Sequence, residues 1–182
     1  DALLKDKSFN SVIIFASTKE NVKKLDRNLH KLGIQSKSIH SDLEQIEREH
    51  ILREFKNKQL NVLIGTDELS RGIDVEGIDL VINYDVPPDP EDYIHRIGRT
   101  ARAATTGTAI TFINDLDQRK FFRIESMIGK DIPKITLPPE LGEGPVYSPE
   151  TRKSEPRGNK GGGNKKNFRR KPFRGKKGGK PA

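Results

Sequence analysis

Three arginines lie within seven residues of one stretch, "YIHRIGRTARA", which runs from Tyr93 to Ala103. Arg96, Arg99 and Arg102 recur at every third position. Guanidinium groups stay charged at neutral pH and bind phosphate oxygens through paired hydrogen bonds. Gly98 permits a bend that would let all three side chains reach one ligand. The spacing therefore indicates a site for a polyanion, with an ordinary exposed basic helix as the alternative.

A second stretch, "GTDELSRGID" from Gly65 to Asp74, is dense in charges and contains Thr66. It connects two apolar runs that are typical of buried strands, and charged side chains held there need partners. Two interpretations stay open from the residues alone. The stretch is either a binding site, or an internal Asp67–Arg71 ion pair followed by a turn at Gly72.

Two further patterns place polar side chains where a strand meets a helix. In "FAST", the hydroxyls of Ser17 and Thr18 stand at an expected helix N-terminus, where free backbone N–H groups suit a phosphate. In "DLEQIER", Gln45 and Arg48 are three residues apart on one helical face. Taken singly, a helix cap and a solvated helix face are the more ordinary explanations.

The elements that must position these residues follow from the apolar pattern. Near-continuous apolar strands that alternate with helices predict an α/β fold, a parallel sheet with helices on both faces. Ligands of such sheets bind beyond the carboxyl ends of the strands. The polar pairs Ser17–Thr18 and Thr66–Asp67, together with Asp85, each follow one of these runs. The expected strands are 11–16, 36–40, 61–66, 79–85 and 108–114, and the expected helices are 22–32, 44–56, one that opens at Asp89–Pro90, and 115–128.

The net charge of +8 is concentrated at one end of the chain. From Thr151 onward there are 13 Lys and Arg against one acidic residue, a net charge of +12. The first 150 residues carry 21 basic and 25 acidic residues, a net charge of −4. A segment so rich in Gly, Lys and Arg cannot bury enough apolar area to fold. We therefore predict one folded domain over residues 1–138 and a disordered, RNA-binding tail over 139–182.

The composition of the 182 residues also limits the classes of function. There is no cysteine, which excludes disulfides and thiolate metal sites and suits a cytoplasmic protein. The four histidines are scattered without metal-ligand spacing, so no metal site is expected. No apolar run is long enough to span a bilayer. The chain begins with Asp1 rather than Met, which leads us to expect that it is cut from something longer.

Two motifs of nucleotide hydrolases are absent from the sequence. There is no GxxxxGK[ST] phosphate loop, and no DExD or DExH motif that would hold Mg²⁺ after a strand. The arginines suit the charge of a phosphoryl group in transfer, but nothing in the chain would cradle the rest of a nucleotide. This combination predicts a partner domain.

Four motifs in fixed order, "SVIIFAST", "HSDLEQIER", "VLIGTDELSRGIDV" and "YIHRIGRTAR", resemble the C-terminal RecA-like lobe of a DEAD-box RNA helicase. The resemblance covers about Asp1 to Pro138, and the last two motifs are highly specific. The continuation "GKDIPKITLP" and the basic tail are most similar to the bacterial RhlE-type subgroup.

The resemblance implies contacts with RNA. Thr18, Arg48 and Thr66 would contact phosphates of a single strand, with Arg71 beside them and Gln45 holding the same surface. Together with the hydroxyl of Ser17, the expected RNA-binding residues are Ser17, Thr18, Gln45, Arg48, Thr66 and Arg71.

The resemblance also implies contacts with ATP. Asp74 would bind the ribose, and Arg99 and Arg102 would be arginine fingers on the γ-phosphate. His95 and Arg96 would link the lobe to the acidic motif and the nucleotide across the cleft. The Mg²⁺ that accompanies ATP would be held by an N-terminal lobe that this chain lacks.

Three positions depart from the commonest family pattern. Ser41 stands where "HGD" has Gly, Gly65 where "ATD" has Ala, and Ala101 where "GRTGR" has Gly. The first two exchange one small residue for another. Ala101 stiffens the backbone between the two expected arginine fingers, because glycine has the greater freedom in φ.

The leading hypothesis is one half of an ATP-dependent RNA helicase, inactive as an ATPase by itself. RNA and ATP would favour closure of the two lobes, and bent RNA no longer fits a duplex. A second hypothesis is a stand-alone RNA-binding module that uses the tail. A third is an ordinary nucleotide-binding α/β domain, which the missing phosphate loop disfavours.

Overall fold

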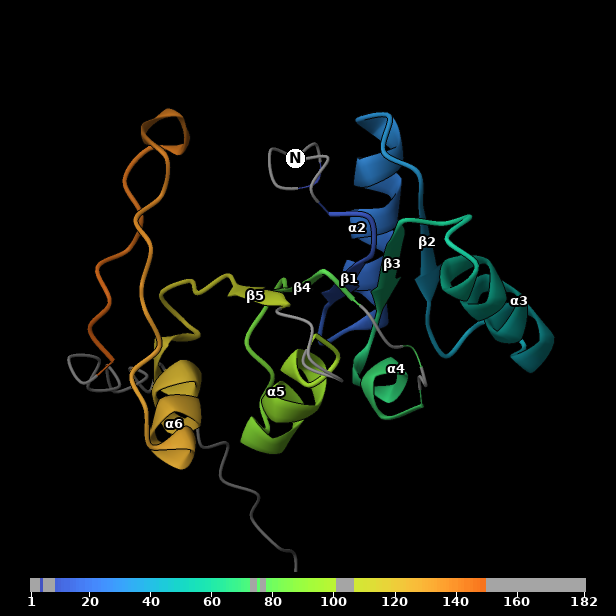
Figure 1. Cartoon of the computed structure of the whole chain (residues 1–182). Coiled ribbons are helices and arrows are strands. Elements are labelled where there is room, and N and C mark those ends of the chain that lie inside the picture. The colour runs from blue at the N-terminus through green and yellow to red at the C-terminus, as the bar shows by residue number, and fades with distance from the viewer. Residues whose placement is uncertain (1–3, 5–8, 73–74, 76–77, 101–106, 150–182) are drawn as a thin grey trace, which may run out of the picture. The chain divides into compact units, whose positions relative to one another are not determined.

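The structure of this chain is a computed structural model that describes residues 4, 9–72, 75, 78–100 and 107–149 (Figure 1). Within this part, the side chains of residues 70–72 lie outside the description. Contacts divide the chain into two units, Asp1–Thr151 and Arg152–Ala182, and the first of them contains every residue described below. The predicted tail beyond residue 149 lies outside the described residues.

Five parallel strands form one sheet in the order β2-β3-β1-β4-β5 (Figure 1). The three central strands are buried along their whole length, which explains why their sequences are almost continuously apolar. The predicted parallel α/β architecture is confirmed. The strands are β1 Val12–Phe15, β2 Ser36–Ile39, β3 Val62–Gly65, β4 Leu80–Asn83 and β5 Thr108–Thr111.

Helices cover both faces of the sheet. On β1, Ile13 and Phe15 pack on the face covered by α3 and α4, whereas Val12 and Ile14 pack on the face covered by α2. This division follows from the alternation of side chains along a strand. The helices are α2 Lys19–Lys31, α3 Gln45–Lys56, α4 Asp67–Gly72, α5 Pro90–Ile97, α6 Gln118–Ile128 and the 3-10 turn η1 Pro139–Leu141. Among the described residues, no helix has the length and apolarity needed to cross a membrane.

The helix boundaries follow local capping chemistry. Asp89 caps α5 by accepting a hydrogen bond from the amide of Glu91 at 3.0 Å, and Pro90 takes the first helical position, as predicted. After α2, Gly33 has a φ of 76° and ends the helical path. The last helix begins three residues later than predicted, at Gln118. The side chain of Asn114 binds the amides that follow it and holds them in a turn.

A buried carboxylate on α6 fixes the chain that follows this helix. Glu125 is 5% exposed and accepts hydrogen bonds from the amide of Ile132 at 2.8 Å and the hydroxyl of Tyr147 at 2.7 Å. The ammonium group of Lys134 also binds it. The ring of Tyr147 packs edge-on against Phe121 of α6. Residues 139–149, which the sequence assigned to the disordered tail, therefore include a segment that packs on the folded domain.

Candidate functional site

Arg96 lies at the centre of the carboxyl edge of the sheet. It is 0% exposed, although it belongs to the arginine stretch whose spacing indicated a polyanion site. Its Nε and Nη2 donate to the two carboxylate oxygens of Asp67 at 2.5 and 3.1 Å, and its Nη1 donates to the backbone oxygen of Asp85 at 3.0 Å. Its guanidinium carbon lies 5.6 Å from the ring centre of Phe15. Arg96 thus joins the ends of three elements instead of facing solvent.

Asp85, at the end of β4, binds Ser17 at the end of β1. The amide of Ser17 donates to both carboxylate oxygens of Asp85, at 2.9 and 3.0 Å, and its hydroxyl donates at 2.6 Å. The hydroxyl proton of Ser17 is therefore already donated within the protein. The sequence analysis expected Ser17 among the RNA-binding residues, with a helix cap as the alternative. In the structure its amide and hydroxyl donate to Asp85, and its hydroxyl oxygen lies 3.4 Å from Nη2 of Arg96.

Three other residues expected at the RNA surface make fewer hydrogen bonds within the protein than Ser17 does. Thr18 is exposed and caps α2, because its Oγ1 accepts a hydrogen bond from the amide of Asn21 at 3.2 Å. This arrangement leaves the hydroxyl proton of Thr18 available. Arg48 is half-buried, and its Nε donates to the backbone oxygen of Leu43 at 3.1 Å. Gln45 is exposed at the start of α3 and binds a side chain one turn further along the same helix.

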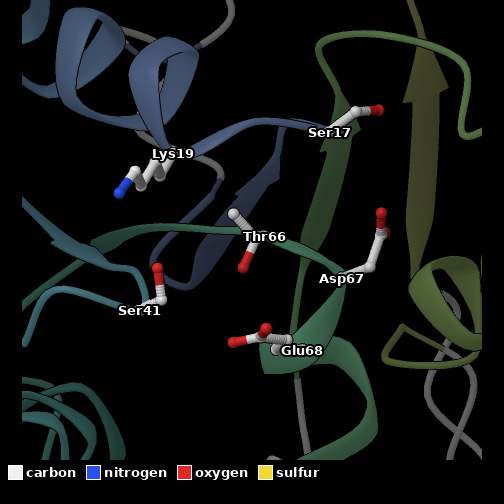
Figure 2. A pocket seen from close by; sticks show the side chains of 6 residues that line it. All are labelled: Ser17, Lys19, Ser41, Thr66, Asp67 and Glu68. Carbon is white, nitrogen blue, oxygen red and sulfur yellow. The ribbon is translucent and has the colours of Figure 1, made fainter. Parts of the chain in front are cut away.

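An open pocket of about 320 Å³ lies beside this network, between the start of α2, the loop after β2 and the start of α4 (Figure 2). Thr66, predicted from the sequence, contributes its hydroxyl. The sequence analysis did not predict the four other lining residues, Lys19, Ser41, Asp67 and Glu68, as binding residues. For Lys19 the available signal was its place directly after Thr18, and for Ser41 it was the departure from the family glycine. The pocket is lined by Ser17, Lys19, Ser41, Thr66, Asp67 and Glu68.

Positive charge gathers at the α2 side of the pocket. Lys19 and Lys23 both bind the carboxylate of Asp42, at 2.9 and 2.6 Å. These hydrogen bonds, from Lys23 first and then Lys19, hold the pKa of Asp42 at about 2. The neighbouring His40 is 8% exposed, and burial together with the charges of Lys23, Lys19 and Arg48 lowers its pKa, against the opposing effect of Asp42. Its Nδ1 is a buried side-chain atom with no hydrogen-bond partner in the described part of the chain.

The residues predicted to contact the nucleotide are only partly described. Helix α5 ends at Ile97, and Arg99 follows it, half-buried, with its Nε 3.4 Å from the backbone oxygen of His95. The side chain of His95 is about half exposed, with Nδ1 4.0 Å from a carboxylate oxygen of Asp92. Thus Arg96 and Arg99 do not share one surface. Asp74, Ala101 and Arg102, and the side chain of Arg71, lie outside the described residues.

The packing of Leu69 in α4 explains why position 65 is a glycine. A Cβ atom added at Gly65 would lie 2.1 Å from Cδ2 of Leu69, which is buried in the core beside the pocket. The glycine at position 65, where the family commonly has alanine, therefore leaves room for the side chain of Leu69. This packing holds the first turn of α4, which begins at Asp67, against the sheet.

Comparison with known proteins agrees with this geometry. Residues 1–104 match the helicase conserved C-terminal domain family. The crystal structure of the Escherichia coli DEAD-box protein SrmB superposes with a TM-score of 0.71 at 32% identity, over 83% of this chain and 85% of that one. The chain belongs to the DEAD-box helicase family as its C-terminal domain. The predicted RecA-like fold is thereby confirmed.

Two other relatives show how much of a full-length protein the chain represents. The ATP-dependent rRNA helicase RRP3 of Yarrowia lipolytica is 41% identical over 138 residues, which are 76% of this chain and 29% of that protein. Saccharomyces cerevisiae Dbp5, solved bound to RNA and ADP BeF3, superposes with a TM-score of 0.66 at 34% identity, over 72% of this chain and 34% of that one. The chain thus spans about a third of such proteins or less.

Proposed function

We propose that this chain is the C-terminal lobe of an ATP-dependent RNA helicase and supplies half of an RNA-binding surface. The observation that carries the proposal is the pocket at the carboxyl edge of the sheet, which places the hydroxyl of Thr66 beside Lys19. Hydroxyl, ammonium and guanidinium groups are the usual donors to nucleic-acid phosphates. The relative Dbp5, whose structure contains RNA, supports this choice of ligand.

The proposed RNA surface extends from the pocket to both sides. Thr18 has a hydroxyl proton to donate. Arg48 lies in the first turn of α3, and within the described residues its Nη groups make no hydrogen bond. Gln45 stands one helical turn before Arg48 and would hold the same surface. Ser17 is better assigned to positioning, because its donor groups bind Asp85. Arg71 completes the proposed set from α4.

The proposed nucleotide side lies beyond the end of α5. Arg99 and Arg102 would stabilise the charge of the transferred phosphoryl group, and Asp74 would bind the ribose of ATP. His95 would reach toward the acidic motif of the N-terminal lobe, which would hold the Mg²⁺. Arg96 would act through position rather than contact, because it is buried and binds Asp67. The N-terminal lobe and a cytoplasmic location are parts of the same proposal.

In this mechanism the pocket and the end of α5 act together. RNA held at Thr66 and Arg48, and nucleotide held near Arg99, would each favour the closed arrangement of the two lobes. Arg96 connects α4, which starts at the pocket, to α5, which leads to Arg99. The contacts of Arg96 thus connect the two proposed binding surfaces. The finer assignment to the RhlE-type subgroup rests on sequence motifs alone, and the RRP3 relative comes from a yeast.

Binding of single-stranded RNA by the 182-residue chain tests the proposed surface. Arg48→Ala and Thr66→Val are expected to weaken binding several-fold each, and Arg48→Ala to reduce the salt slope by about one ion, as for one lost phosphate contact. The matched control is Arg53→Ala, which removes the same charge from the exposed far end of α3. Equal effects of Arg48→Ala and Arg53→Ala would refute the surface.

The tail favours a second candidate function, a stand-alone RNA-binding module. Its net charge of +12 is sufficient for salt-dependent binding without sequence preference. Deletion of residues 151–182 separates the two candidates. If all RNA binding is lost and the Arg48 and Thr66 variants have no effect in the intact chain, the module is the better account.

A further inference from the structure

The pocket beside the Arg96 network presents groups of opposite chemical character. Figure 2 shows the hydroxyls of Ser41 and Thr66 and the carboxylate of Glu68 turned toward a common space, with Lys19 at its rim. In the same view Ser17 and Asp67 are turned away from this space, in keeping with their bonds to Asp85 and Arg96. The hydroxyls can donate, whereas an ionised carboxylate can only accept.

The three groups that face the space are available to a ligand. Within the described residues, no hydrogen bond or ion pair engages the side chains of Ser41, Thr66 or Glu68. The fourth group, Lys19, is shared with Asp42, which reduces the positive charge that it offers. Within the described residues, the carboxylate of Glu68 therefore has hydrogen-bond acceptor sites that a ligand could use.

A carboxylate is an unexpected neighbour for a phosphate. Like charges repel, and the carboxylate of Glu68 would lie close to any phosphate bound by Ser41 and Thr66. A ligand that brought only a phosphate would therefore be penalised by Glu68. The penalty is offset if the same ligand also brings a hydrogen-bond donor that reaches the carboxylate. In a single strand of RNA, each phosphate has such a donor nearby in the ribose 2′-hydroxyl, which DNA lacks.

We propose that Glu68 accepts a hydrogen bond from a ribose 2′-hydroxyl while Ser41 and Thr66 donate to an adjacent phosphate, so that this pocket selects RNA over DNA. The inference rests on the proposed function, because it assumes that a nucleic-acid strand occupies the pocket. Glu68 would repel the phosphate of either kind of strand. Only in a strand with a 2′-hydroxyl would the hydrogen bond offset this repulsion, and the difference gives the specificity. Ser41, which replaces the family glycine, adds a phosphate donor at the same place.

A different role for Glu68 is purely structural. It lies in the first turn of α4, where an acidic side chain interacts favourably with the exposed amides of the helix. That role affects folding stability and has no means of distinguishing ribose from deoxyribose. The ratio of RNA affinity to DNA affinity therefore separates the two roles.

The test compares oligouridylate with oligodeoxyuridylate of equal length, bound to the 182-residue chain at fixed salt. The basic tail is expected to bind both strands alike, so it contributes little to their ratio. Glu68→Ala is expected to lower the ratio of RNA to DNA affinity about fivefold to tenfold, the effect of one hydrogen bond to a charged acceptor. Most of this change is expected as tighter DNA binding. Glu68→Gln retains an acceptor without the charge and is expected to give an intermediate ratio.

Two further variants complete the design. Ser41→Gly is expected to weaken RNA and DNA binding by the same factor, because it removes a phosphate donor only. Glu140→Gln is the charge control, since Glu140 is exposed in the η1 turn and does not line the pocket.

Two outcomes would overturn the inference. One is an equal gain in RNA and DNA affinity on Glu68→Ala, which would make Glu68 a repelling charge only, and the other is no change in either affinity. Thr66→Val distinguishes these outcomes from a failure of the proposed function. If Thr66→Val weakens RNA binding while Glu68→Ala leaves the ratio unchanged, only the 2′-hydroxyl assignment fails. If Thr66→Val has no effect, the RNA surface itself is misassigned.

Discussion

The guanidinium of Arg96 and the carboxylate of Asp67 form a two-point ion pair that joins α5 to the first residue of α4. The arginine is 0% exposed and the aspartate side chain 23%, so the pair is largely shielded from water. Two nitrogens of a planar guanidinium meet two oxygens of one carboxylate, which fixes orientation as well as distance. The pair therefore sets the position of α4, and with it Thr66 and Glu68, relative to α5.

Loss of Arg96 should destabilise the fold strongly. Arg96→Ala leaves Asp67 and Asp85 without their shared cation, and breaking a buried pair from one side costs about 3–5 kcal/mol. Arg96→Lys is expected to recover only part of this, because an ammonium group cannot make the two parallel bonds. Urea unfolding measures both effects. The control Arg123→Ala, at an exposed position of α6, is expected to change stability by less than about 0.5 kcal/mol.

Gly65 and Leu69 should show strong coupling. Gly65→Ala forces the side chain of Leu69 to move and is expected to cost about 1–3 kcal/mol, as overpacking does. Leu69→Ala empties part of the core and is expected to cost about 2–5 kcal/mol. The double variant should cost less than the sum of the two, by about 1 kcal/mol or more. Strict additivity in the unfolding data would show that the two side chains do not compete for the same space.

Glu125 and the three groups that bind it, from Ile132, Lys134 and Tyr147, form a clamp. This clamp should make the stability of the fold depend on pH. Burial alone would raise the pKa of Glu125, but hydrogen bonds from Lys134, Tyr147 and the amide of Ile132 outweigh it and hold the pKa below 4.5. A carboxyl whose pKa is lower in the folded state than in the unfolded chain adds stability above pH 4.5, and this stability is lost as the pH falls through the folded value. Glu125→Gln is expected to flatten this part of the stability profile between pH 7 and pH 3. A profile unchanged by the substitution would contradict the assignment.

Tyr147 should stabilise the fold through both its hydroxyl and its ring. Tyr147→Phe removes the bond to Glu125 and is expected to cost about 1–3 kcal/mol, since it takes a donor from a buried carboxylate. Tyr147→Ala also removes the edge-on contact with Phe121 and is expected to cost more. Hydrogen exchange of the Ile132 amide reports on the clamp directly. Equal stability of the two variants would show that the contact between the rings of Tyr147 and Phe121 does not stabilise the fold.

The sequence predicted the sheet and its polar edge because both depend on local patterns. Apolar runs ending in Ser17, Thr66 and Asp85 were sufficient to place these residues at one edge of a parallel sheet. What the pattern could not predict was which partner each polar group would choose. The hydroxyl of Ser17 binds Asp85, 68 residues away, and Arg96 binds Asp67, 29 residues away.

Three-residue spacing was also insufficient to keep the arginines on one surface. Helix α5 ends at Ile97, so Arg96 belongs to the helix and points into the core, whereas Arg99 follows the helix. Glu68 and Lys19 were missed for a related reason. Each looks like an ordinary charged residue at a helix start, and only the packing of α2 and α4 around one pocket brings them together.

The most direct test of the account is ATP hydrolysis with saturating RNA, measured for this chain alone and for a protein that also contains the N-terminal lobe. We predict no turnover by the chain alone and RNA-stimulated turnover by the two-lobe protein. Arg99→Ala in the two-lobe protein should reduce that turnover roughly 10³-fold or more, as loss of an arginine finger does. Turnover by the isolated chain, or an Arg99→Ala protein with unchanged turnover, would contradict the account.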